Sequence, residues 1–241
     1  MDFLYGAVSE QCSSRSHVNQ DNFGAVLTVD SNDRKVLTGV VCDGVSMSYR
    51  SEIASYNTIL SILRWAERYF PENIFDSNQI MNEIDRELKI CNDIINDFSS
   101  KFANDDYSCC TVSGIVTDGN EIVTFNAGDS RIYEIDMHDE KLYLLTNDDK
   151  AEDGHSISMC MGAFESNELK ITFGKHKFLD GNVYLLCTDG MYRRQNFKKW
   201  GKNLSEAENR DMIIECLSNM LNEVRELGET DDVTSLAIIS K

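Results

Sequence analysis

Apolar residues along the chain form short runs of strand length, and polar turn residues separate these runs. The first strands are predicted at Leu4 to Cys12, Phe23 to Val29 and Lys35 to Cys42, with a polar turn at 30–33. After residue 44 the apolar positions recur every three or four residues, which is typical of a helix that lies on a sheet. The chain is therefore predicted to begin with antiparallel strands and to continue into helices.

Three longer segments have the apolar period of a helix. The first ends at Pro71 and the second spans roughly Asn78 to Phe102. The buried stripe of the first helix is predicted to comprise Ile53, Tyr56, Leu60, Leu63, Ala66 and Phe70. A third helix is predicted over 205–227, because Ser205 and Glu208 have the spacing of a capping box.

Strand patterns return between the second and third helices. Residues 109–117 and 121–127 are predicted to form a hairpin, and shorter strands follow at 132–135 and 141–146. The chain closes on a strand predicted over 231–239, which starts with two carboxylates. Helices that segregate from antiparallel strands favour an α+β fold of packed layers over alternating βαβ units.

Two of the apolar strands lead directly into an Asp-Gly pair. These pairs are Asp43-Gly44 and Asp189-Gly190. A carboxylate at the end of a rigid strand is held in position before an ion arrives, and oxygen ligands suit Mg²⁺ or Mn²⁺. Asp-Gly is also ordinary turn chemistry, so each pair taken singly has this simpler interpretation. Acidic residues at other strand ends are Asp21, Asp129, Asp231 and Asp232.

The net charge narrows the classes of function. The chain has 241 residues, of which 41 are acidic and 23 are basic, giving a formal charge of −18. This charge repels nucleic acid and anionic membrane surfaces at long range, so we expect neither as a partner. Much of the charge serves solubility, and some carboxylates remain available for divalent cations.

Composition also bounds the organisation of the chain. Pro71 is the one proline and no Gly/Ser-rich linker occurs, so we expect a single domain over residues 1–241. The N-terminus lacks the layout of a signal sequence and the apolar runs are short, from which we expect a cytoplasmic protein. The 8 cysteines are scattered through apolar runs without a CxxC pair, which predicts buried free thiols rather than zinc or disulfides.

Five short motifs carry the acidic residues. They are Asn19-Gln20-Asp21-Asn22-Phe23, Val41-Cys42-Asp43-Gly44, Asn126-Ala127-Gly128-Asp129-Ser130-Arg131, Leu185-Leu186-Cys187-Thr188-Asp189-Gly190 and Asp231-Asp232-Val233-Thr234. In order and spacing they resemble the motif series of the metal-dependent protein phosphatases of type 2C. Any one motif is weak, but five in the right order are hard to obtain by chance. The resemblance covers nearly the whole chain.

This resemblance implies both a fold and a site. The fold would be a four-layer α-β-β-α sandwich, in which helix pairs flank two mainly antiparallel sheets. Two Mg²⁺ or Mn²⁺ ions would bind at one end of the sandwich. By matching position, Asp43 would bridge both ions and the Gly44 carbonyl would join one of them, while Asp189 and Asp231 would hold the other.

Three further carboxylates are assigned by the same matching. Asp21 would act through a metal-bound water, and Asp129 would hold a third, weaker ion. The family has Asp-Asn near the end of the chain. The ligand is therefore placed on Asp231, with Asp232 as the equivalent of the asparagine.

Several segments depart from the family pattern. Arg15 is the candidate phosphate-binding arginine, although it lies slightly farther from Asp21 than is usual. Residues 45–48 lack the usual Gly-Gly pair and histidine, which predicts that water protonates the leaving group. Arg193 replaces a carboxylate, which weakens the case for a third ion and puts a cation near the substrate. The segment 147–154, which corresponds to the family's mobile flap, is short.

The implied activity is hydrolysis of phosphoserine and phosphothreonine in proteins by a water that bridges the two ions. The partners would be phosphoproteins and a cognate Ser/Thr kinase, and we expect a monomer. The alternative within the fold is a pseudophosphatase that binds partners without catalysis. The presence of Asp43, Asp189 and Asp231 favours activity. Another two-metal hydrolase, such as a nuclease, is disfavoured by the net charge.

Overall fold

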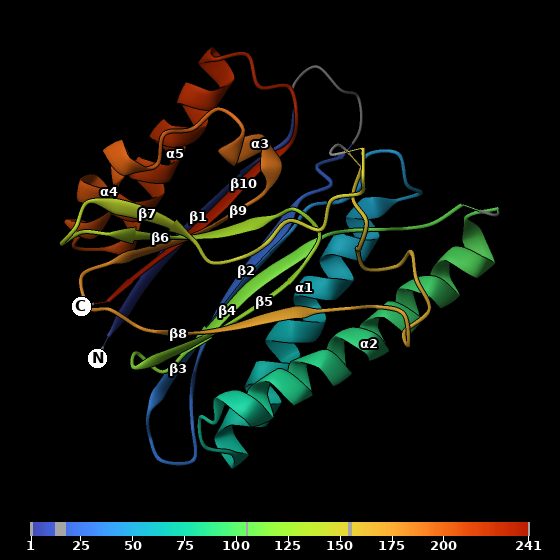
Figure 1. The fold of residues 1–241 in the computed structure, drawn as a ribbon, viewed down its shortest axis with the longest axis horizontal. Coiled ribbons are helices and arrows are strands. Elements are labelled where there is room, and N and C mark those ends of the chain that lie inside the picture. Colours follow the sequence, from blue (N-terminus) through green and yellow to red (C-terminus); the bar gives the residue numbers. More distant parts are fainter. Residues whose placement is uncertain (1, 13–17, 105, 154–155, 241) are drawn as a thin grey trace.

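The computed structural model describes residues 2–12, 18–104, 106–153 and 156–240, and in these residues the strands form two five-stranded sheets (Figure 1). The first sheet contains, in spatial order, β1 (Phe3–Glu10), β10 (Val233–Ser240), β9 (Val183–Cys187), β6 (Arg131–Asp136) and β7 (Lys141–Leu144). The second contains β2 (Asn22–Val29), β3 (Lys35–Cys42), β4 (Val112–Thr117), β5 (Glu121–Ala127) and β8 (Thr172–Lys177). Every pair of neighbouring strands in both sheets is antiparallel.

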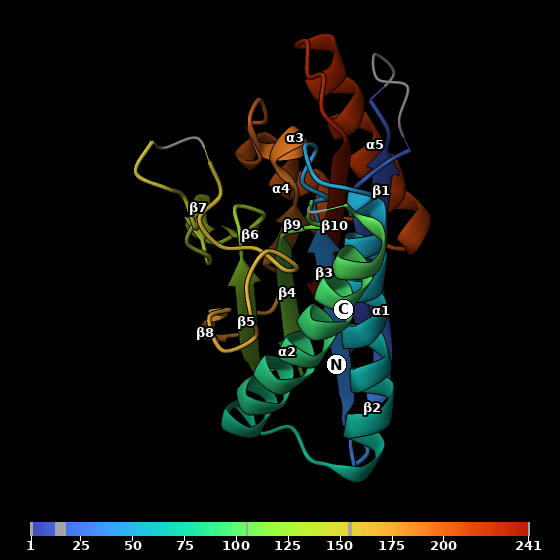
Figure 2. The same cartoon turned by 90° about the vertical axis from the view of Figure 1, so that its right-hand side faces the viewer.

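Helices cover the outer side of each sheet, as Figures 1 and 2 show. The second sheet is covered by α1 (Ser51–Tyr69) and α2 (Ser77–Phe102), which a short 3₁₀ turn, η1 (Phe70–Glu72), joins. On the side of the first sheet lie α3 (Asp189–Tyr192), α4 (Lys198–Ser205) and α5 (Arg210–Glu226). The resulting order of helices, sheet, sheet and helices confirms the predicted α-β-β-α sandwich.

Three buried apolar clusters hold these layers together. One lies between α1, α2 and the second sheet, and includes Ile62, Ile84 and Val40. Another lies between the two sheets and includes Leu37 and Leu236. The last packs α4 and α5 on the first sheet. Burying an aliphatic side chain of this size contributes about 1.5–3 kcal/mol, so the three clusters fix the ends of the strands as one rigid frame.

The pairing of the first strand differs from the order of strands along the chain. β1 pairs with β10, so that Phe3 lies opposite Ser240, and it forms no ladder with β2. The predicted hairpin of β4 and β5 is confirmed, with Val112 opposite Ala127. Apolar periodicity identifies strands but carries no information on which distant strand a segment will meet. For this reason the β1–β10 pair could not be predicted.

Two details of the helices are corrected. Tyr56 of the predicted stripe is 55% exposed, and the buried face of α1 instead contains Ala54 and Thr58, where the helix lies close to the sheet. The third predicted helix begins at Arg210 rather than at Ser205, because Ser205 is the last residue of the preceding helix, α4. Asn209 caps α5 by accepting a hydrogen bond from the Met212 backbone N–H at 3.0 Å.

Two further expectations concern the cysteines and the membrane. All eight cysteines are buried and free, as predicted. Within the described residues, no helix combines the length and the apolar character that a membrane span requires.

Candidate metal centre

The ends of several strands bring the acidic residues of the motifs together at one end of the sandwich. Asp43 directly follows β3, Asp189 opens α3 just after β9, and Asp231 stands just before β10. Because β3 belongs to one sheet while β9 and β10 belong to the other, these carboxylates meet across the two layers. The antiparallel pairing of β9 with β10 places the end of one beside the start of the other.

The position of Asp43 is fixed by its backbone. Its N–H donates to Thr111 Oγ1 at 3.0 Å, and its carbonyl accepts from the Thr111 N–H at 2.8 Å. The next residue must be glycine, since a Cβ on Gly44 would lie 2.6 Å from the Gln20 carbonyl oxygen and 2.8 Å from Ser51 Oγ. A close approach of backbones, rather than a left-handed turn, therefore accounts for this Asp-Gly pair.

The carboxylates of the centre perturb one another. Burial raises the pKa of Asp43 well above its usual value, and the nearby charges of Asp21, Asp189 and Asp231 raise it further. Burial also raises the pKa of Asp189 to about 6, against the opposing effect of Arg193. Such a group of carboxylates is stable in its ionised form only with cations close by.

Two carboxylate oxygens in the centre have no hydrogen-bond partner among the described residues. These buried atoms are Oδ1 of Asp189 and Oδ1 of Asp129. A buried oxygen without a partner is costly, and a bound cation removes that cost. Carboxylate oxygens are the ligands that Mg²⁺ and Mn²⁺ prefer. The donor atoms present therefore fit the chemistry of the divalent ions that the motifs imply.

Asp231 and Asp232 have different surroundings. Both carboxylate oxygens of Asp232 accept backbone N–H groups, from Cys12 and from Gln20, each at 2.8 Å. Asp232 is only 4% exposed, and it ties together the two segments of chain that carry these groups. Asp231 instead directs Oδ2 toward the guanidinium of Arg193, at 3.1 Å from Nη1. This difference supports Asp231 as the ligand of the pair.

Arg193 places a positive charge within the centre. It lies at the C-terminal cap of α3, and its side chain forms ion pairs with both Asp189 and Asp231. Among the described residues, no three His, Cys, Asp or Glu side chains are arranged so that they could hold an ion as they stand. In this arrangement the cation shared by Asp189 and Asp231 is Arg193.

Asp21 stands just before β2, and its charge acts on Asp43. Its Oδ2 accepts a hydrogen bond from Thr188 Oγ1 at 2.8 Å. Burial raises the pKa of Asp21 to about 8, although hydrogen bonds from Thr188 and Thr234 act in the opposite direction. Thr188 Oγ1 also accepts from the Thr234 N–H at 3.1 Å, so Asp21 is fixed to the strands of the opposite sheet.

Asp129 stands at the margin of the centre, between β5 and β6. The Tyr192 hydroxyl donates to its carbonyl oxygen at 3.0 Å. Arg131 lies over the Tyr192 ring at 3.9 Å and binds Asp148 with two hydrogen bonds, of 2.8 and 2.7 Å. Burial and the charge of Asp148 raise the pKa of Asp129. Arg131 thus anchors the Asp129 turn to Asp148 and Tyr192.

The structure does not bring every predicted residue into the centre. It also shows residues that support the centre and that the sequence did not indicate. Arg15 lies outside the described residues. The segment 45–48 is held against the start of β4, where the Val45 N–H donates to the Cys109 carbonyl at 3.0 Å. Thr111 was missed because a threonine in a strand has no distinctive signal. Thr188 was present in a motif but was given no role.

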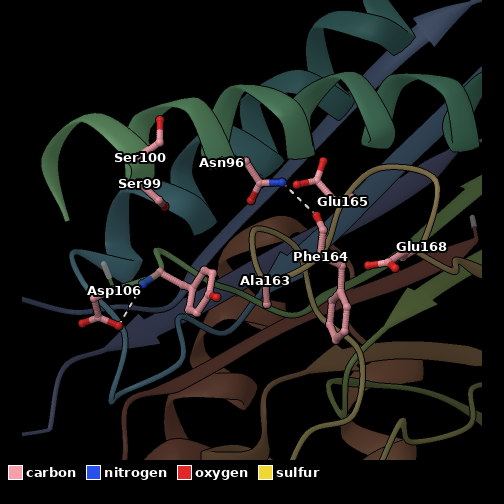
Figure 3. A pocket seen from close by; sticks show the side chains of 9 residues that line it. Asn96, Ser99, Ser100, Asp106, Ala163, Phe164, Glu165 and Glu168 are labelled. Carbon is pink, nitrogen blue, oxygen red and sulfur yellow. Dashed lines mark hydrogen bonds between the residues drawn. The ribbon is translucent and has the colours of Figure 1, made fainter. Parts of the chain in front are cut away.

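A cavity of about 610 Å³ lies elsewhere, between the C-terminal half of α2 and the segment 163–168 (Figure 3). The Asn96 side-chain amide crosses it to donate to the Phe164 carbonyl at 2.8 Å. Its lining includes no carboxylate of the candidate metal centre, so the candidate chemistry does not belong to this cavity.

Comparisons with known proteins agree with the observed fold. Residues 9–229 match the family model for protein phosphatase 2C. Among solved structures, the serine/threonine phosphatase of S. agalactiae has a TM-score of 0.79 at 15% identity, with 100% of each chain covered. The serine/threonine phosphatase PstP/Ppp of Mycobacterium tuberculosis has a TM-score of 0.77 at 19% identity, with 99% of each chain covered.

PppA of Pseudomonas aeruginosa, described as a key regulatory component of T6SS, has a TM-score of 0.76 at 17% identity and covers 99% of this chain and 98% of its own. No curated protein matches the sequence. The solved structures share the fold, and the family model matches most of the chain. The chain therefore belongs to the protein phosphatase 2C family.

Proposed function

We propose that this protein is a metal-dependent phosphatase that hydrolyses phosphoserine and phosphothreonine in proteins. The observation that carries the proposal is the buried group of carboxylates around Asp43, in which Asp189 and Asp129 each keep an oxygen without a partner. The chain that carries these residues belongs to a family of phosphatases. Residues 1–241 would act as one phosphatase domain.

The proposed ligands are divided between two ions. Asp43 would contact both, the Gly44 carbonyl would contact one, and Asp189 with Asp231 would hold the other. Asp129 would belong to a third, weaker site. Two Mg²⁺ or Mn²⁺ ions bound there supply positive charge for the phosphoryl oxygens and lower the pKa of the attacking water.

The chain's own residues supply position and proton transfer. Asp21, held by the Thr188 hydroxyl at 2.8 Å, would orient the attacking water and accept a proton from it. Arg15 would bind the phosphate. Residues 45–48 contain no histidine, so a water molecule would protonate the leaving serine or threonine.

The proposed partners follow from this chemistry. Phosphorylated Ser/Thr proteins would be the substrates, and a Ser/Thr kinase acting on the same proteins would be the functional counterpart. We propose a monomer as the active form. A formal charge of −18 disfavours nucleic acid as a substrate.

The test is hydrolysis of p-nitrophenyl phosphate and of a phosphothreonine peptide, with Mn²⁺ or Mg²⁺ and with EDTA. Asp189→Asn removes one proposed ligand and is expected to lower kcat/KM by roughly 100-fold or more. Asp139→Asn is the matched control, because Asp139 pairs with Lys141 in the turn between β6 and β7. Hydrolysis that persists in EDTA, or full activity of Asp189→Asn, would overturn the proposed mechanism.

A pseudophosphatase is the second candidate, and one observation favours it. Arg193 already provides Asp189 and Asp231 with a cation. If the wild-type protein binds Mn²⁺ in a calorimetric titration but hydrolyses neither substrate, the binding-module function replaces the enzyme. Hydrolysis that depends on Mn²⁺ excludes this alternative.

A further inference from the structure

Arg193 reaches into the candidate metal centre from the end of a short helix. Its backbone N–H donates to the Asp189 carbonyl at 3.1 Å, which closes the turn of α3. Its two terminal nitrogens then divide between two carboxylates. Nη2 pairs with Asp189 Oδ2, and Nη1 lies 3.1 Å from Asp231 Oδ2. One guanidinium therefore joins a residue that follows β9 to a residue that precedes β10.

The charge of this guanidinium is permanent and its shape suits two carboxylates. Arginine remains protonated across the physiological range, and its planar fork can bind two oxygens at once. Its charge opposes the rise in the pKa of Asp189 that burial causes. Without Arg193 or a metal ion, Asp189 and Asp231 would repel each other and Asp43.

We propose that Arg193 holds Asp189 and Asp231 in the metal-free protein and competes with a divalent cation for these two carboxylates. Binding of the cation is then linked to release of the guanidinium. The identity of the cation as Mg²⁺ or Mn²⁺ rests on the proposed function. An internal competitor lowers the apparent affinity for the ion, because only molecules with the guanidinium displaced can bind it.

Release requires movement of the side chain alone. The Arg193 side chain is 48% exposed, so it can turn outward without opening the apolar core. The start of α3 is anchored independently of the guanidinium, because the Thr188 N–H donates to the Thr234 carbonyl at 3.1 Å. The guanidinium therefore leaves while the backbone that carries Asp189 stays fixed.

The next residue provides a matched control. Arg194 has nearly the same exposure, 47%, but its Nε pairs with Glu229 Oε2 at 3.4 Å. Replacing Arg194 removes the same charge from the same segment without freeing either Asp189 or Asp231. Any effect confined to Arg193 variants therefore arises from its two ion pairs and not from the net charge.

The experiment measures binding of Mn²⁺ directly, by calorimetry, together with the midpoint of thermal unfolding in EDTA and in Mn²⁺. We expect Arg193→Ala and Arg193→Gln to bind the ion at the Asp189 and Asp231 site roughly five- to tenfold more tightly than wild type. Their unfolding midpoint should be lower in EDTA and should rise more on addition of Mn²⁺. Arg194→Ala should stay close to wild type, and Arg193→Lys, which keeps the charge but not the fork, should lie between wild type and Arg193→Ala.

The outcomes separate this inference from the proposed function. Equal or weaker Mn²⁺ binding by folded Arg193→Ala and Arg193→Gln overturns the competition, even where the wild type hydrolyses phosphothreonine peptide. Tighter binding by these variants without hydrolysis by any variant supports the competition and contradicts the enzyme. Tighter binding by Arg194→Ala as well would assign the effect to net charge and also overturn the inference.

Discussion

The two Asp-Gly pairs share a sequence pattern but lie in different surroundings. Asp43 follows β3 and is buried among carboxylates, and its burial together with their charges raises its pKa well above the usual value. Asp189 opens a helix, and one turn later that helix provides Arg193 as a partner. The Asp-Gly pair sets where each carboxylate lies. Four positions after Asp189, Arg193 provides a positive side chain from the protein itself.

The glycines of the two pairs serve the same purpose by different contacts. Neither Gly44 nor Gly190 has a positive φ. Each instead lies against a backbone carbonyl that a Cβ would meet, from Gln20 for Gly44 and from Asp232 for Gly190. Turn formation therefore does not explain either glycine. Each allows a strand end to approach a neighbouring segment closely.

The largest expected effect is a difference in catalytic activity between variants of Asp43 and of Asp189. Asp43→Asn should lower kcat/KM by more than Asp189→Asn, because Asp43 is proposed to contact both ions while Asp189 contacts one. We expect a loss for Asp43→Asn that exceeds the roughly 100-fold typical of a supporting residue. Steady-state hydrolysis of p-nitrophenyl phosphate in Mn²⁺ measures both variants. A larger loss for Asp189→Asn would contradict the bridging role.

The second effect is a difference in stability between alanine variants of Gly44 and of Gly190. Gly190→Ala should lower the free energy of unfolding by about 3 kcal/mol and Gly44→Ala by about 1–2 kcal/mol. The order follows from the shorter contact, 2.0 Å to a backbone oxygen against 2.6 Å. Urea unfolding in EDTA measures both. Equal midpoints for the two variants would show that the neighbouring segments yield easily.

Gly181→Ala is the control for this pair. A Cβ at Gly181 would meet nothing within 4 Å, and only the φ of +81° opposes the substitution. We expect this substitution to lower the free energy of unfolding by about 1 kcal/mol, through the backbone conformation alone. A cost for Gly190→Ala no larger than this would contradict the importance of the contact with Asp232.

The sequence predicted the layers well because each layer has a local signal. Alternating apolar runs identified the strands, and three- and four-residue spacing identified α1 and α2. The α1 stripe was wrong at Tyr56, since the face of the helix that packs on the sheet instead contains Ala54, Thr58, Ile62 and Trp65. The start of α5 was wrong because Ser205 and Asn209 both resemble a cap. Only the folded chain shows which of them accepts the backbone N–H.

The sequence located the candidate site only through the residues that its motifs contain. The positions of Asp43 and Asp189 follow from strand ends and motif order. The support of Asp43 by Thr111 depends on β3 lying beside β4, which no local pattern encodes. The pairing of Arg193 with Asp231 likewise joins residues 38 positions apart. Contacts between distant segments therefore account for most of what was missed.

The third effect is a difference between variants of Asp231 and Asp232 in stability and in Mn²⁺ binding. Asp232→Ala leaves two buried backbone N–H groups, of Cys12 and Gln20, without their acceptors. We expect it to lower the free energy of unfolding in EDTA by about 2 kcal/mol. Asp231→Asn should instead weaken Mn²⁺ binding and change the stability in EDTA less. Urea unfolding and calorimetry on both variants give the comparison, and the reverse pattern would move the ligand to Asp232.

The smallest effect is a dependence of stability on pH that the metal should remove. The folded, metal-free protein has a pKa of about 8 at Asp21 and about 6 at Asp189, both above the ordinary value of 3.8. Between pH 3.8 and about pH 8 the folded protein therefore binds more protons than the unfolded chain. This contribution to stability is complete below pH 3.8 and is lost as the pH rises through 6 and 8.

In EDTA the urea midpoint is therefore expected to fall as the pH rises from about 5 to 8. A bound divalent ion favours the ionised carboxylates, so saturating Mn²⁺ should flatten or reverse the decline. Asp21→Asn removes the group with the higher pKa and should reduce the slope in EDTA while leaving the contribution of Asp189. A midpoint in EDTA that rises with pH would contradict the raised pKa values and would show that the folded protein keeps these carboxylates ionised without a metal ion.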